Sequence, residues 1–246
     1  QPIADSRQPS AVSRQPSAAR LPAAEQQAVR LSAGYRYTCE LTERGAARCW
    51  GDDSFGQLGE GTTITRSGRV FQAISAGAVH TCGITTGGAA YCWGDNRNGQ
   101  LGIGGNRARS VAVLGGLVFR AISAGAEFTC GLTTAGAAHC WGSNDNGQLG
   151  DGTTSDRPRP VAVAGGLVFH ALSAGAEFAC GLTTAGTAYC WGANGNGQLG
   201  DGTTGDRTSP VAVAGGLVFH TISAGSEFVC GLTTGGAAYC WGDNAF

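Results

Sequence analysis

The sequence predicts an all-β fold, a β-propeller of five blades with four antiparallel strands each, and two repeated features lead to this prediction. Ten cysteines form five pairs with nine residues between the members of a pair, and the second cysteine of every pair is followed by Trp-Gly. The tryptophans lie 43, 48, 50 and 50 residues apart, a period typical of propeller blades. The chain is therefore expected to be one array of similar units.

One unit shows how its strands follow one another. Its apolar segments are 118–125, 127–133, 137–141 and 160–163, and a Gly-Gln-Leu-Gly turn precedes the last of them. The segments are short, rich in β-branched and aromatic residues, and bounded by Gly, Asn, Asp or Thr, as strands are. We therefore expect four strands per blade, with the propeller covering residues 25–246 and an extended N-terminal arm covering residues 1–24.

The two cysteines of a unit are predicted to face each other across a hairpin. Cys130 and Cys140 are symmetric about Ala135, and the third residue of this loop is Gly in every unit. Three-residue hairpin loops commonly end in a left-handed residue, which Gly adopts without steric cost. Facing residues have Cα atoms roughly 4.5 to 5.5 Å apart, within reach of a disulfide. We predict five disulfides, Cys39–Cys49, Cys82–Cys92, Cys130–Cys140, Cys180–Cys190 and Cys230–Cys240.

Two other interpretations of the cysteines are reduced, buried thiols and a zinc site. Zinc ligands usually lie two to four residues apart and need a second pair or histidines nearby, whereas each unit offers two facing thiols. A disulfide closing a loop of this length stabilises the fold by about 2.5 to 3 kcal/mol. Five disulfides indicate an oxidising compartment, so we expect a secreted or cell-surface protein.

Charge and composition argue against nucleic acid as a partner and against a membrane span. The net charge of −1 gives no electrostatic footprint for nucleic acid, and no apolar stretch approaches the roughly 20 residues that span a bilayer. The sequence starts at Gln1 and contains no Met, from which we expect maturation by cleavage. No motif indicates a cofactor or a metal.

The repeated motifs resemble the repeats of the regulator-of-chromosome-condensation family. They are Ser75-Ala-Gly77, His80-Thr-Cys-Gly-Ile-Thr85, Tyr91-Cys-Trp-Gly94 and Gly99-Gln-Leu-Gly102, and their equivalents cover about nine-tenths of the chain. The resemblance implies a β-propeller, usually of seven blades. It also implies one of several activities: guanine-nucleotide exchange, chromatin binding or, in a secreted bacterial relative, inhibition of a β-lactamase. Fold alone does not select among these functions.

The departures from the family argue against exchange activity. The family's strand histidine occurs only as His80, and its place is otherwise taken by Tyr37, Phe128, Phe178 and Phe228. The paired cysteines are not part of the nuclear members' pattern, and no inserted hairpin of the kind that exchange factors use is found. The chain has five units rather than seven.

Candidate catalytic groups are sparse. The histidines, His80, His139, His170 and His220, do not combine with a nucleophile and an acid in one motif, so no catalytic residue is predicted. Glu127, Glu177 and Glu227 occupy one position in three successive units and could form an arc of carboxylates, although a solvated face is the simpler interpretation. The Asn- and Asp-rich turns before Gly99, Gly147 and Gly197 lack the first carboxylate of a calcium loop, which favours ordinary turns.

The tryptophans are predicted to hold neighbouring blades together. Each adjoins a cysteine on a strand and so points to the opposite face of the sheet. Packing against the next blade is favoured over a sugar-stacking platform. These blade-packing residues are Trp50, Trp93, Trp141, Trp191 and Trp241.

The two ends of the chain suggest how it could assemble. The arm repeats a heptad whose prolines forbid a continuous helix, and the last unit lacks the strand that follows the Gly-Gln-Leu-Gly turn elsewhere. The arm contains imitations of that strand, so it could close its own last blade or pair with the open blade of the next subunit. The predicted assembly residues are Gln1, Pro2, Ile3, Ala4, Gln8, Pro9, Ala11 and Val12.

Three functional classes follow. The first is a secreted, non-enzymatic structural protein whose partner is itself, forming a head-to-tail filament or surface layer through the arm. The second is a secreted module or inhibitor that presents a propeller face to an unidentified protein. The third, an enzyme or exchange factor, has no site in the sequence.

Overall fold

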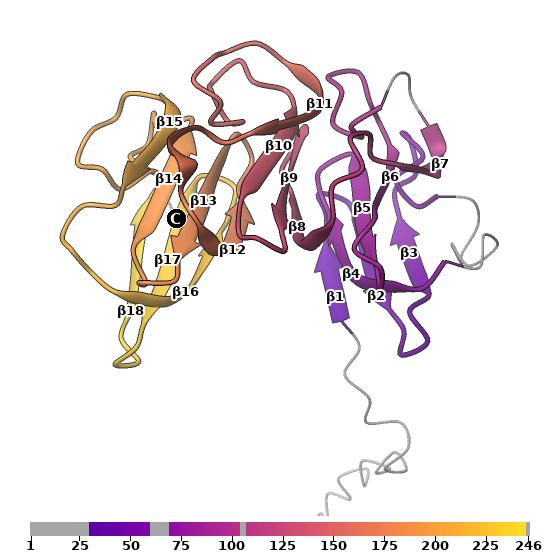
Figure 1. Cartoon of the computed structure of the whole chain (residues 1–246), viewed down its shortest axis with the longest axis horizontal. Helices are drawn as coiled ribbons and strands as arrows, with labels where there is room; N and C mark the ends of the chain where they lie inside the picture. The colour runs from indigo at the N-terminus through magenta and orange to yellow at the C-terminus, as the bar shows by residue number, and fades with distance from the viewer. Residues whose placement is uncertain (1–29, 60–68, 104–106, 245–246) are drawn as a thin grey trace, which may run out of the picture.

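The computed structural model describes residues 30–59, 69–103 and 107–244, which form a five-blade β-propeller with almost no helix (Figure 1). Each blade is an antiparallel sheet of consecutive strands. The first blade contains β1 (Arg30–Ala33), β2 (Tyr37–Leu41) and β3 (Ala47–Gly51); the second β4 (Phe71–Ala76), β5 (His80–Thr85), β6 (Ala90–Gly94) and β7 (Arg107–Ala112). The third contains β8 (Phe119–Ala124), β9 (Phe128–Thr133), β10 (Ala138–Gly142) and β11 (Arg157–Ala162); the fourth β12 (Phe169–Ala174), β13 (Phe178–Thr183), β14 (Ala188–Gly192) and β15 (Arg207–Ala212). The fifth contains β16 (Phe219–Ala224), β17 (Phe228–Thr233) and β18 (Ala238–Gly242), and a short 3-10 turn, η3 (Ala164–Gly166), links the third and fourth blades.

The prediction of a five-blade propeller is confirmed, but not every blade has four strands. The middle three sheets have four strands, and the first and last have three in the part of the chain that the structure describes. In the first blade, the segment after β3 falls largely in residues 60–68, outside the described residues. In the fifth blade, no described strand pairs with the outer edge of β18.

The cysteine register follows the predicted hairpins. Cys130 faces Cys140 in the pairing of β9 with β10, and the same pairing recurs in the other four blades. The loop ends at Gly136 with φ of 83°, the left-handed conformation that the sequence required. The paired sulfur atoms lie 2.03 to 2.10 Å apart, with Cα atoms 4.1 Å apart, so each blade carries one disulfide.

The core lies between blades, because the sheets of the second, third and fourth blades are covered on both faces by their neighbours. We call the side of a blade that carries the disulfide its cysteine face and the opposite side its tryptophan face. The cysteine face of the fourth blade, with Phe178 and Leu182, packs against Phe219 and Trp241 on the tryptophan face of the fifth. Equivalent apolar clusters join the first blade to the second, the second to the third and the third to the fourth. The repeated unit is therefore stabilised mainly by its neighbours.

In the part of the chain that the structure describes, the ring is not closed between the fifth and first blades. Around the axis, the Ser32 hydroxyl accepts a hydrogen bond from Ala76 N–H at 2.9 Å, and the next three blades repeat this Ser–Ala bond. No described residue completes the series between Ser223 and Ala33. Inner strands of successive blades contact each other, whereas β16 and β1 make no comparable contact. The array therefore ends in a tryptophan face at the first blade and a cysteine face at the fifth.

The hairpin glycines provide a test of this blade packing. Gly186 and Gly236 have φ of 81° and 83°, so alanine at either position costs about 1 kcal/mol in backbone strain. A Cβ on Gly186 would also lie 2.6 Å from Val218 Cγ1 and 2.9 Å from Phe219 O of the fifth blade, whereas one on Gly236 meets nothing within 4 Å. Gly186→Ala should therefore lower the free energy of unfolding in urea by about 1 to 3 kcal/mol more than Gly236→Ala. Equal losses for the two variants would contradict the packing.

Candidate functional site

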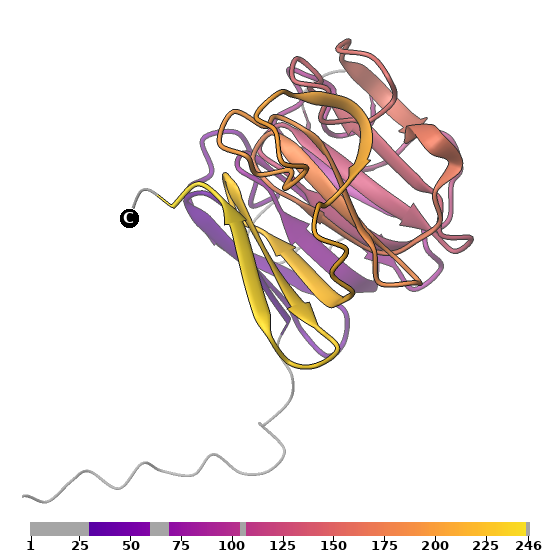
Figure 2. The same cartoon turned by 90° about the vertical axis from the view of Figure 1, so that its left-hand side faces the viewer.

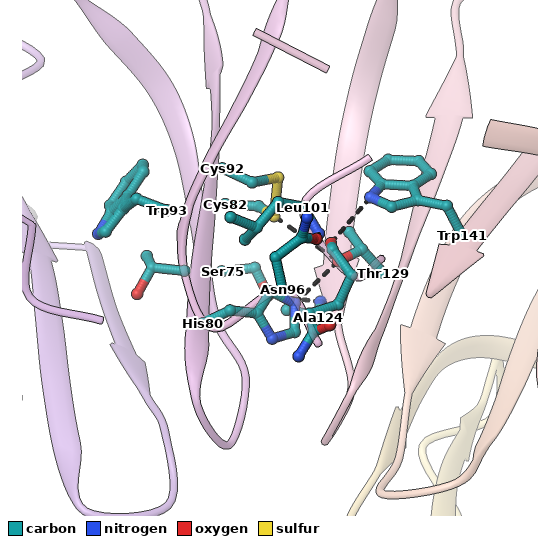
Figure 3. The surroundings of a disulfide bond; sticks show 12 residues. Ser75, His80, Cys82, Cys92, Trp93, Asn96, Leu101, Ala124, Thr129 and Trp141 are labelled. Atoms are coloured by element: carbon teal, nitrogen blue, oxygen red, sulfur yellow. Dashed lines mark hydrogen bonds between the residues drawn. A yellow bond between two sulfur atoms is a disulfide. The ribbon is translucent and has the colours of Figure 1, made fainter. Parts of the chain in front are cut away.

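The contact between blades is built around one tryptophan and one glutamine. In the second blade, the turn after β6 presents the carbonyl oxygen of Gln100, which accepts hydrogen bonds from Trp141 Nε1 at 2.9 Å and Thr129 Oγ1 at 2.9 Å, both in the third blade (Figure 3). The other three interfaces repeat the indole bond at 2.9 to 3.0 Å. The Gly-Gln-Leu-Gly turn of one blade therefore holds the tryptophan of the next blade through this hydrogen bond.

The Asn- and Asp-rich segments directly before it fix the conformation of the Gly-Gln-Leu-Gly turn. Asn96 Oδ1 accepts the Leu101 N–H at 2.8 Å, and Asn144 and Asn194 make the same bond to Leu149 and Leu199. Asn144 also donates to the Thr153 carbonyl at 3.0 Å. These side chains are fully used by the turn, as expected of turns rather than calcium loops. Among the described residues, no group of three or more His, Cys, Asp or Glu side chains could hold a metal ion.

The arc of glutamates is engaged in contacts between blades. Asn98 Nδ2 donates to Glu127 Oε2 at 2.7 Å, and Asn146 and Asn196 donate in the same way to Glu177 and Glu227 at 3.0 Å. Each bond joins the turn after the third strand of one blade to the residue directly before the second strand of the next. The carboxylates therefore act as exposed polar links between blades.

The four histidines do not gather into one site. His80 is completely buried in the second blade, and its Nε2 lies 2.8 Å from Thr129 Oγ1 of the third. Loss of solvation lowers the pKa of His80 to about 4, although the nearby charge of Asp95 opposes the shift. His170 donates through Nδ1 to the Thr183 carbonyl at 3.0 Å, and His220 is exposed. Burial also lowers the pKa of His139.

The tryptophans lie where the predicted packing needs them in four blades. Trp93, Trp141 and Trp191 are completely buried against the preceding blade, and Trp241 is partly covered by the fourth blade. Trp50 is 49% exposed, because no described residue precedes the first blade to cover its tryptophan face. The arm residues predicted for assembly, 1–4, 8, 9, 11 and 12, lie outside the described residues.

The uncovered face of the fifth blade is the best candidate for a functional site. Phe228 and Leu232 are 44% and 38% exposed, whereas the equivalent Phe178 and Leu182 are completely buried beneath the next blade. Their blade, drawn in yellow, lies in front in Figure 2, at one end of the array of blades. A cavity of about 510 Å³ lies on this face, lined by Phe228, the Cys230–Cys240 disulfide, Trp241 and residues 242–244. It corresponds to the place that the tryptophan of the following blade fills elsewhere.

The exposure of Phe228 and Leu232 was not predicted from the sequence. The same two residue types are buried in the third and fourth blades, so their local sequence carries no signal of exposure. The only available signal was the missing match, in the last unit, to the fourth-strand motif of the preceding units. It marked the open edge of the blade but not its open face.

A second opening, of about 320 Å³, lies on the propeller axis. It is lined by the turns after the innermost strand of all five blades, mostly Ala and Gly, and no charged residue lines it. No helix of the described residues is long and apolar enough to cross a membrane.

Comparison with known proteins assigns the repeats. Residues 28–57, 71–100, 119–148, 169–198 and 219–246 match the description "Regulator of chromosome condensation (RCC1) repeat", and a second model of the same repeat matches 87–132, 135–182 and 185–232. The comparison with curated proteins found no match to this chain.

Solved structures share this fold. Human WBSCR16 is 18% identical with a TM-score of 0.79, covering 88% of this chain and 62% of its own. Prp20p from Saccharomyces cerevisiae, described with its binding to Gsp1p and histones, is 22% identical with a TM-score of 0.74, covering 87% and 57%. The ectodomain of the Physcomitrella patens receptor kinase CR4 is 25% identical with a TM-score of 0.65, covering 88% and 52%. The chain thus spans about half to three-fifths of the length of these structures.

His80 should make stability depend on pH. The folded-state pKa of His80 is about 4, below the usual value of 6.5. Between pH 4 and pH 6.5 this imidazole is therefore mostly protonated in the unfolded chain and mostly neutral in the folded chain, so lowering the pH favours unfolding. The free energy of unfolding should fall by about 2 to 3 kcal/mol as pH drops from 7 to 4.5. His80→Phe, which copies Phe128, should remove most of this dependence in urea titrations at the two pH values. A variant with the same pH dependence as the parent chain would contradict the assignment.

The exposed disulfide should be reduced first. Cys240 is exposed and Cys230 half-buried, whereas the cysteines of the other four blades are at most 4% exposed. Because thiol–disulfide exchange requires access to a sulfur atom, mild reductant on the dilute native chain should open Cys230–Cys240 before the others. Alkylation followed by mass spectrometry of peptides measures the order. Simultaneous release of all ten thiols would show that the blades open together.

Proposed function

Because the chain belongs to the regulator of chromosome condensation (RCC1) repeat family, we propose that it is a non-enzymatic propeller that binds protein, and that its partner is a second copy of itself. RCC1-type propellers are mostly binding or regulatory modules. The described residues contain no arrangement of nucleophile, base and acid that would favour catalysis. Binding is the function that this surface supports best.

The observation that carries the proposal is the uncovered cysteine face of the fifth blade. Four equivalent faces in the same chain are buried against a protein surface, with aromatic and aliphatic side chains excluded from water. Burying an exposed Phe or Leu stabilises a complex by about 1.5 to 3 kcal/mol. Exposed apolar surface of this kind marks interaction sites in soluble proteins.

The proposed setting is extracellular. Five disulfides, one in each blade, are consistent with an oxidising compartment. A structural relative with 25% identity is itself a receptor ectodomain. Secretion or display at the cell surface therefore fits the chemistry of this chain.

In the proposed self-assembly, the N-terminal arm of one copy binds the fifth blade of the next. One copy would donate its arm, residues 1–24, and the next would accept it at the fifth blade. Donor and acceptor differ, so the contact is head-to-tail and extends into a filament or layer unless it closes on itself. Donation of an extended strand to an open sheet is a known mode of protein recognition.

A second candidate is binding or inhibition of an unrelated protein through a propeller face. It is favoured by a row of exposed valines, each directly before the innermost strand of its blade. Val70, Val118, Val168 and Val218 are 46% to 55% exposed. An apolar row repeated in four blades could contact one broad partner surface.

Removing residues 1–18 distinguishes the two candidates. If the arm joins the copies, the full chain should form concentration-dependent assemblies in sedimentation velocity, and the truncated chain should sediment as a monomer. Substituting Val168→Ser, in the valine row, should leave assembly unchanged. A truncated chain that still assembles, or a full chain that stays monomeric at high concentration, would overturn the self-assembly proposal.

A further inference from the structure

Among the described residues, no strand pairs with the outer edge of β18, whereas the three preceding blades each have a fourth strand there. In those blades a fourth strand pairs with the third, and its end is fixed by one main-chain bond. Val113 N–H donates to the Ala90 carbonyl at 2.9 Å, Val163 to Ala138 at 3.0 Å and Val213 to Ala188 at 2.9 Å. The equivalent acceptor in the fifth blade is the carbonyl of Ala238, to which no described residue donates this bond. Among the described residues this edge is therefore unpaired, and the preceding blades show the register in which a strand would pair with it.

The side chains of the fourth strand in the preceding blades indicate which side chains a strand added at this edge would need. Val211 faces Cys190 in the pairing of β14 with β15, and Val211 and Val213 pack in the apolar cluster with Phe178 and Leu182. An incoming strand in the same register would face Cys240 and place two side chains, two residues apart, beside Phe228 and Leu232. Phe228 and the Cys230–Cys240 disulfide also line the cavity of about 510 Å³ on the uncovered face. The site therefore suits an extended segment with small or β-branched side chains at alternate positions.

The sequence contains one segment outside the described residues that repeats this chemistry. The fourth strands of the third and fourth blades read Pro160-Val-Ala-Val163 and Pro210-Val-Ala-Val213, and the arm contains Pro9-Ser-Ala-Val12. All three share Pro-x-Ala-Val. Proline is tolerated on a strand at the edge of a sheet, which is the place of the fourth strand in these blades.

We propose that the outer edge of β18 is a strand-acceptor site and that its occupant is Pro9–Val12 from the arm of a second copy. In this arrangement Ala11 N–H and C=O lie opposite Tyr239, Ser10 lies opposite Cys240, and Val12 N–H donates to the Ala238 carbonyl. Val12 takes the place of Val213, and Ser10 that of Val211. The inference rests on the proposed self-assembly and identifies the two surfaces that make it.

Peptide competition on the full chain tests the site. Two peptides are used, residues 7–14 of the arm and residues 207–214 of the fourth blade, together with a matched 7–14 control carrying Val12→Asp. Both native peptides should dissociate the assemblies in sedimentation velocity, and the control should need about tenfold higher concentration because it places a charge in an apolar site. Hydrogen exchange should show protection of residues 238–242 when either native peptide is bound.

Two variants of the chain locate the contact. Leu232→Asp, on the face beside this edge, should weaken peptide binding about tenfold, and Leu114→Asp should not. Leu114 is a matched control because it is also an exposed leucine, at 41% against 38% for Leu232, and lies outside the fifth blade. Circular dichroism and urea unfolding of both variants establish that a loss of binding does not come from unfolding.

The outcomes separate the inference from the proposed function. Native peptides that bind no better than the Val12→Asp control, or protection outside 238–242, would overturn the acceptor site, even if removal of residues 1–18 still abolished assembly. Peptide binding to a truncated chain whose full-length parent is monomeric would show that the arm closes its own blade, which overturns the role of the second copy. Competition, protection and the Leu232→Asp effect together would establish the site.

Discussion

The packing of one blade's tryptophan on the cysteine face of the preceding blade is the interaction on which this propeller depends. The indole is removed from water between aromatic and aliphatic side chains, and its N–H is satisfied by the carbonyl of a Gln in the preceding turn. An indole N–H buried without a partner would cost about 1 to 3 kcal/mol. The Gln-containing turn, the Asn that holds it and the tryptophan therefore form one unit that spans two blades.

This arrangement makes every blade incomplete by itself. A three- or four-stranded sheet with two apolar faces cannot leave both in water, so its stability comes from its neighbours, as in other repeat proteins. The disulfide stabilises the hairpin within a blade but does nothing to cover its faces. Stabilising the hairpin of a blade and covering its two faces are thus separate requirements. The disulfides meet the first requirement in all five blades. Among the described residues the second is not met at the two ends of the array, where Trp50 and Phe228 remain exposed.

The open end differs chemically from an ordinary exposed surface. Its apolar side chains are copies of residues that are buried elsewhere in the same molecule, and its free sheet edge has a register fixed by three internal examples. The requirements for a ligand can therefore be taken from the molecule's own interfaces. A segment that pairs with β18 and supplies alternate apolar side chains would satisfy both the edge and the nearest part of the face.

Much of the fold followed from the sequence, because repetition makes local signals redundant. The five Cys–Cys spacings, with Gly at the third loop residue, determined the hairpin register, since Cys130 and Cys140 can face each other only if the loop is centred on Ala135. The roles of the Gln-Leu turn and the histidines were less accessible. His80 occupies the position of Phe128 and is buried because the third blade covers it, a fact that its own strand does not encode.

The sequence by itself determined the number of blades and the pairing of the cysteines. These depend on contacts between residues close in the chain, for which spacing and turn chemistry are sufficient. Only the tertiary structure decided which faces are covered, because the exposure of Trp50, Phe228 and Leu232 depends on whether another blade lies beside them. Identical strand sequences are core in the middle of the array and surface at its end, since burial is a property of the neighbour rather than of the strand.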